Sequence, residues 1–102
     1  MDDTMTASVA RALAHPARLH ILRLLADQTE CRGAEVFSEL PLAQSTISEH
    51  LRVLKEAGLI ISHSEGVSMV YCLVPGALDT FVSHVASITR TAAACGPAKR
   101  KC

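Results

Sequence analysis

Apolar and polar positions in residues 41–60 follow the period of an amphipathic helix. Ile47, Leu51 and Leu54 recur at spacings of three and four residues, which places them on one buried stripe. Gly58 comes just after the apolar run, at the position where a residue with positive φ commonly ends a helix. The segment therefore predicts a helix with one buried face and one polar face, followed by a glycine stop.

Three shorter helices are predicted before this one. Residues 7–13 carry a short helical pattern, and Pro16 suits the first turn of the next helix. Residues 32–40 predict a short helix, and Pro41 opens the tight turn that leads to the helix from Gln44. The apolar positions expected to face inward in the second and third helices are Leu19, Ile21, Leu22, Leu24, Leu25, Val36, Phe37 and Leu40.

A hairpin and a last helix are predicted after the glycine stop. Two β-rich runs between residues 59 and 74 flank Glu65 and Gly66, which is typical of a two-stranded hairpin. Residues 77–94 predict a helix that ends before Gly96. Its apolar side consists of Leu78, Phe81, Val82, Val85 and Ile88. The order of elements predicts a mainly α fold with a small β-hairpin wing, a winged helix-turn-helix.

The length of 102 residues is that of one domain, so we expect a single winged helix-turn-helix domain over residues 1–102. A domain of this size has a thin core, and its first and last helices carry apolar faces that the core does not use. We therefore expect a homodimer that forms through these two helices. Residues 95–102 are expected to be a mobile tail.

Charge and composition narrow the class of protein. Ten Lys and Arg balance ten Asp and Glu, so binding to DNA would rest on docked contacts more than on a long-range basic field. The sequence has no membrane-length apolar run and no basic signal-peptide start, which predicts a cytoplasmic protein without a membrane partner. It also lacks phosphate-loop and nucleophile motifs, so we expect neither an enzyme nor a permanently bound cofactor.

Three stretches resemble the ArsR/SmtB family of metal- and metalloid-sensing repressors, namely residues 14–25, 42–51 and 54–60. Within that family the sequence is most similar to arsenic repressors with C-terminal cysteines. The resemblance implies a homodimer that binds double-stranded operator DNA. It also implies an inducer that lowers the affinity for DNA when it binds.

The polar face of the helix from Gln44 supplies the candidate DNA contacts, because short or forked polar groups reach base edges and cations reach phosphates. The resemblance implies that Gln44, Ser45, Thr46, Ser48 and His50 face the major groove. It implies further that Arg52 and Lys55 approach phosphates, and that the wing tip, His63 to Gly66, lies by the adjacent minor groove.

The cysteines supply the candidate inducer site, because soft thiolates suit trivalent arsenic and antimony. Positions 32 and 34, where the family's Cys-x-Cys pair would fall, hold Arg and Ala, and the zinc-type site of the last helix is incomplete. Cys95 and Cys102 bracket the end of the last helix and form the predicted site. A third thiol would come from Cys31 or Cys72, or else the site takes a two-thiol organoarsenical. The predicted function is repression of an arsenic-resistance type operon, relieved by As(III) or a related thiophilic metalloid.

Two other functions compete with this one. A thiol redox or persulfide sensor on the same scaffold would pair Cys31 with Cys95. A winged helix used only for protein–protein interaction would explain the zero net charge. The polar segment that begins at Gln44 argues against it, because interaction surfaces are more often apolar or aromatic at their centre.

Overall fold

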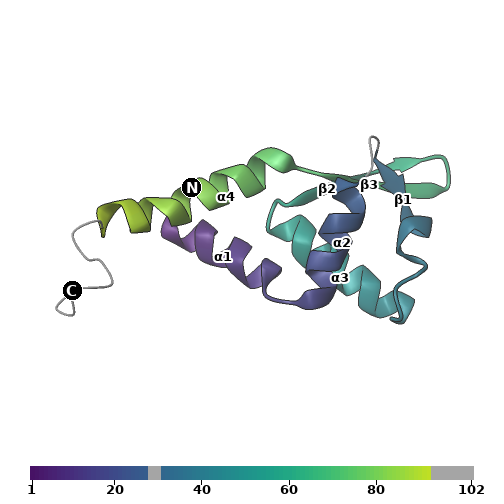
Figure 1. The fold of residues 1–102 in the computed structure, drawn as a ribbon. Coiled ribbons are helices and arrows are strands. Elements are labelled where there is room, and N and C mark those ends of the chain that lie inside the picture. The colour runs from purple at the N-terminus through teal and green to yellow at the C-terminus, as the bar shows by residue number, and fades with distance from the viewer. Residues whose placement is uncertain (28–30, 93–102) are drawn as a thin grey trace.

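The structure is a computed structural model and describes residues 1–27 and 31–92. Its elements, in chain order, are α1 (Asp3–Leu13), α2 (Pro16–Ala26), β1 (Arg32–Gly33), the 3₁₀ helix η1 (Ala34–Phe37), α3 (Gln44–Glu56), β2 (Ile60–Glu65), β3 (Ser68–Leu73) and α4 (Pro75–Thr91). Helices α2 and α3 lie under the sheet, whereas α1 and α4 lie side by side at the end away from the hairpin tip (Figure 1). None of the helices in the described ranges is long and apolar enough to span a bilayer.

Side chains that cap the first two helices fix where those helices begin. The carboxylate of Asp2 accepts a hydrogen bond from the backbone N–H of Met5 at 2.8 Å, so α1 starts at Asp3, before the predicted range. His15 Nδ1 accepts from the N–H of Ala17 at 3.1 Å, and Pro16 occupies the first turn of α2. The predicted start of the second helix is confirmed.

The sheet has three antiparallel strands in the order β1-β3-β2. The hairpin prediction is confirmed, and its two-residue loop has a positive φ of 64° at Gly66, the first loop position, as in a type II′ turn. The prediction of a helix over residues 32–40 is wrong. Arg32 and Gly33 pair instead with Tyr71 and Val70 of β3, and only the single turn η1 follows. Glycine is a poor helix former, and pairing with β3 satisfies the backbone groups of this segment.

The hydrophobic core lies where α1, α2, α3 and the sheet meet. Its most buried large side chains are Ile21, Phe37, Leu54, Leu59 and Ile60. Phe37 meets the ring of Tyr71 edge-on, with 5.7 Å between centroids, and this contact joins η1 to β3. Leu19 was expected to be buried but is exposed on α2.

Helices α1 and α4 leave an apolar face uncovered. None of the residues of α4 is fully buried, and Val82 and Ile88 are 62% and 66% exposed. Val85 lies between them at helical spacing, and Met5 of α1 is also exposed. The prediction that these helices carry apolar side chains beyond what the core uses is therefore confirmed. We call Met5, Val82, Val85 and Ile88 the α1/α4 apolar face.

Candidate nucleic-acid interface

Helix α3 has the bounds that the pattern predicted. It starts at Gln44 and ends just before Gly58, whose φ is +80°. Ile47 packs against the core, and Leu51 and Leu54 are buried in it. The side chains of Gln44, Ser45, Thr46 and Ser48 are exposed on the first turns of the helix, as predicted. These turns therefore offer polar groups to an outside partner.

The prediction that His50 lies on the outer face is wrong. Its side chain is only 7% exposed, and its ring lies 4.5 Å from the ring of His15, between centroids. Arg18 Nε donates a hydrogen bond to His50 Nδ1 at 3.2 Å. His50 therefore ties α3 to the start of α2 instead of reaching DNA. Its position agrees with the spacing of the buried stripe, since it lies three residues after Ile47 and four before Leu54.

The burial of His50 predicts a loss of stability in weak acid. Burial lowers the pKa of His50 below its usual 6.5, and the positive charges of His15 and Arg18 lower it further. Below pH 6.5 the unfolded chain takes up a proton that the folded chain resists, so the free energy of unfolding falls as the pH drops towards the lower folded-state pKa.

Urea unfolding at several pH values between 7.5 and 5 measures this effect. We expect His50→Gln to flatten the acid-side slope. Ser64→Gln, at an exposed position, removes no titratable group and should leave it as in the wild type. An identical slope in wild type and His50→Gln would contradict the assignment.

The two cations of the outer face of α3 differ in their surroundings. Arg52 donates to Glu49 Oε2 at 2.9 Å through Nε and to Glu56 Oε2 at 2.7 Å through Nη1, and it also contacts the second oxygen of Glu49. The hydrogen bond from Arg52 lowers the pKa of Glu49, so the cluster stays ionised near neutral pH. Lys55 is exposed. Contact of Arg52 with phosphate would require it to exchange carboxylate partners for phosphate oxygens.

The wing extends beyond the core as the β2–β3 hairpin (Figure 1). His63 is exposed there, and its Nε2 lies 3.2 Å from Glu65 Oε2. Val67 is fully exposed at the tip. The predicted wing-tip segment thus projects from the domain, and a glutamate accompanies its histidine.

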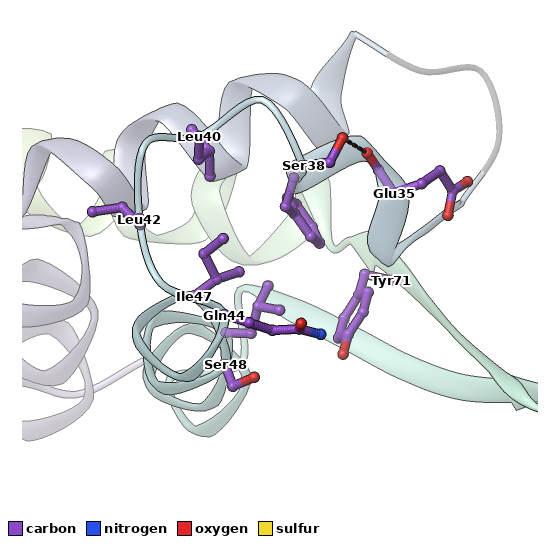
Figure 2. A pocket seen from close by; sticks show the side chains of 10 residues that line it. Glu35, Ser38, Leu40, Leu42, Gln44, Ile47, Ser48 and Tyr71 are labelled. Carbon is purple, nitrogen blue, oxygen red and sulfur yellow. Dashed lines mark hydrogen bonds between the residues drawn. The ribbon is translucent and has the colours of Figure 1, made fainter.

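A surface hollow of about 450 Å³ separates the start of α3 from η1 and β3. Figure 2 shows the side chain of Gln44 pointing towards Tyr71, with Ser48 on the next turn of α3. Phe37 lines the same hollow from η1. The start of α3 therefore shares this hollow with the sheet strand that carries Tyr71.

The cysteines divide into two groups. Cys31 and Cys72 form a disulfide with a Cα–Cα distance of 4.5 Å, across 41 residues of sequence. Cys31 thus has Cys72 as its partner, not Cys95, and neither thiol is free to act as a third ligand while this bond exists. Cys95 and Cys102 lie outside the described residues. Within the described ranges no three His, Cys, Asp or Glu side chains gather closely enough to hold a metal ion.

A compact helical domain with a polar, exposed start of α3 next to a β-hairpin wing defines a winged helix-turn-helix transcription regulator that binds DNA. Residues 15–62 match the family described as "Bacterial regulatory protein, arsR family". The chain belongs to the ArsR family, whose members regulate transcription and are not enzymes. The predictions of fold, family and absence of enzymatic activity are confirmed.

Named relatives agree with this assignment. The uncharacterised HTH-type transcriptional regulator MJ1325 of Methanocaldococcus jannaschii is 38% identical over 79 residues, which are 78% of this chain and 89% of that protein. CmtR of Mycobacterium tuberculosis is 35% identical over 88 residues, covering 86% and 74%. Its solution structure, described as a cadmium metal-sensor, has a TM-score of 0.53 and 37% identity, with coverages of 66% and 68%.

A solved structure from Mycobacterium bovis shares the fold over almost the whole chain. It is a homodimeric winged helix-turn-helix DNA-binding domain, with a TM-score of 0.67 at 24% identity, covering 97% of both chains. The likeness supports the order of elements from α1 to α4.

Proposed function

We propose that this protein is a homodimeric repressor that reads a double-stranded operator with α3 and leaves it when a thiophilic metalloid binds its cysteines. The observation that carries the DNA-reading part is the exposed start of α3, where Gln44, Ser45, Thr46 and Ser48 stand together next to the wing. Side chains of these types hydrogen-bond to base edges in the major groove. Lys55 and His63 would contact the backbone, and Arg52 would join them after leaving its carboxylates.

The α1/α4 apolar face supports the homodimer. Large apolar side chains on one helical face lose contact with water when a second copy covers them, and a two-fold dimer does this with identical surfaces. The Mycobacterium bovis domain of the same fold is described as homodimeric. Two copies would present two α3 helices to two half-sites of one operator.

Thiolate chemistry supports the inducer part. Cys95 and Cys102 would supply two soft ligands close behind α4, where a bound metalloid could alter the dimer. CmtR, a relative over most of the chain, is described as a cadmium metal-sensor. Trivalent arsenic or antimony, free or as an organoarsenical, is the inducer that we propose. For useful derepression, binding of the inducer must weaken binding of the operator by a coupling free energy of about 2–3 kcal/mol.

Fluorescence anisotropy on the promoter fragment upstream of the protein's own gene tests both parts. The reduced protein should bind this fragment, and arsenite or a phenyl arsenical should release it whereas zinc should not. Binding without release by any of these ligands would contradict the inducer, and no binding would contradict operator recognition.

Gln44→Ala should weaken operator binding by about 10- to 100-fold, because one good base contact contributes about 1–3 kcal/mol of discrimination. The effect should be smaller on a scrambled fragment, where that contact is not made. Ser83→Ala, at an exposed position on the side of α4 away from Val82 and Val85, is the control and should bind as the wild type does. Equal affinities of Gln44→Ala and the control for the operator would place the reading surface elsewhere.

A further inference from the structure

Cys31 and Cys72 face each other because of the register of the sheet. Arg32 is opposite Tyr71 and Gly33 is opposite Val70 in the β1–β3 pairing. Extending this register by one residue places Cys31 opposite Cys72. Their Cα–Cα distance of 4.5 Å is the spacing of a non-hydrogen-bonded antiparallel pair. The strands themselves therefore bring the two side chains together, apart from any bond between the sulfurs.

The pair lies on the outer face of the sheet. Side chains alternate along β3, and Tyr71 and Leu73 pack against the core, so Cys72 points to the opposite face. Its neighbour on β2 is Ile61, which is 54% exposed. Cys31 is exposed and Cys72 is half-buried. Both cysteines are therefore at least partly open to solvent, although Val70 on the same face of β3 is buried. Exposed disulfides are also the ones that thiols reduce most readily.

We propose that reduced Cys31 and Cys72 are a binding site for a monosubstituted trivalent arsenical, R–As(OH)₂. Two molecules of an external thiol first reduce the disulfide by exchange, through a mixed disulfide, and leave the two protein thiols and one external disulfide. Each protein thiol then displaces one hydroxyl from arsenic as water. Two As–S bonds form, two As–O bonds break, and arsenic stays trivalent. A ligand with two exchangeable positions matches a site of two sulfurs, and rotation about χ1 lets the sulfurs separate to admit it.

The position of the pair suggests how this ligand affects DNA binding. Cys72 adjoins Tyr71, whose ring packs on Phe37 and lines the same hollow as Gln44 and Ser48 (Figure 2). An arsenic atom between the sulfurs changes how β1 lies on β3 next to Tyr71. We infer that the ligand shifts the start of α3 through this hollow and lowers operator affinity. This last step rests on the proposed function, whereas binding to the pair does not.

The experiment uses the full chain, a phosphine reductant and phenylarsine oxide as the probe. Native mass spectrometry and thiol titration count bound arsenic and remaining thiols. In the Cys95→Ser/Cys102→Ser background, we expect one phenylarsenic per chain and the loss of both remaining thiols. Adding Cys31→Ser or Cys72→Ser should weaken binding by about 100-fold or more, since the second thiol acts at high effective concentration. Either single variant suffices, and circular dichroism selects the one that folds.

The outcomes separate this inference from the proposed function. Loss of the adduct in the Cys95→Ser/Cys102→Ser background, with Cys31 and Cys72 reduced, would overturn the site. If the adduct forms but the protein does not bind its operator, the arsenical site stands and the proposed repressor function is wrong. An adduct that leaves operator affinity unchanged overturns the coupling to α3. If a small disulfide oxidant releases the operator and no adduct forms, the pair is a redox switch and the ligand assignment is wrong.

Discussion

Replacing Leu54 with Ala is expected to lower the free energy of unfolding by about 3–5 kcal/mol. Leu54 is fully buried in the centre of the core, where α3 meets the other elements. Removing its branched end takes away buried apolar contacts and leaves a cavity that rigid neighbours fill only in part. Because small domains are stable by about 5–15 kcal/mol, this one change would consume a large share of the total.

Urea unfolding followed by far-UV circular dichroism measures this difference, with variant and wild type at one protein concentration because an oligomer's stability depends on it. Leu19→Ala is the matched control, since Leu19 is a helical leucine that is exposed. It should cost clearly less than Leu54→Ala, because Leu19 already exposes 37% of its surface and water can fill the space that its side chain leaves. Equal losses in the two variants would contradict the placement of the core.

Ile88→Glu is expected to convert the proposed dimer to monomers and to weaken operator binding by about 100-fold or more. Ile88 is 66% exposed on the uncovered face of α4, so the substitution has little to disturb within one protomer. In the proposed dimer it would bury an unpaired carboxylate against apolar side chains, which is costly. A monomer binds only one half-site, so it loses the affinity that a dimer gains when its two linked α3 helices bind both half-sites together.

Sedimentation velocity gives the mass in solution, and anisotropy on the operator fragment gives the affinity. Ser83→Glu is the control because it adds the same charge to α4 at an exposed position on another side of the helix. It should remain dimeric and bind normally. A dimeric Ile88→Glu would show that the subunits meet elsewhere, and a monomer with wild-type affinity would show that one copy suffices.

The sequence predicted those parts of the fold that local pattern determines. Helix α3 and its glycine stop follow from the spacing of the apolar residues, and the hairpin follows from two β-rich runs around a glycine. Strand β1 could not be predicted in this way. It consists of two residues, and it forms only because β3, far along the chain, offers an edge with which to pair. Taken alone, Val36, Phe37 and Leu40 have the spacing of the buried side of a short helix.

One part of the candidate site could be predicted from local pattern, and two features of the molecule were missed. The exposed start of α3 follows from periodicity. His50 was misplaced because its polarity was given more weight than its position, which falls within the apolar stripe between Ile47 and Leu54. The pairing of Cys31 with Cys72 depends on strand register across 41 residues, and no local pattern carries that information.

The carboxylates that hold Arg52 affect how such a regulator would search a chromosome. On α3, Glu49 and Glu56 offset the charges of Arg52 and Lys55, so this surface attracts arbitrary phosphate backbones weakly. Non-specific DNA affinity depends almost entirely on such attraction and on the counterions that it releases. Few molecules would then be sequestered on the genome's many competing sites. A small number of copies per cell could keep one operator occupied, and they could vacate it quickly once their affinity falls.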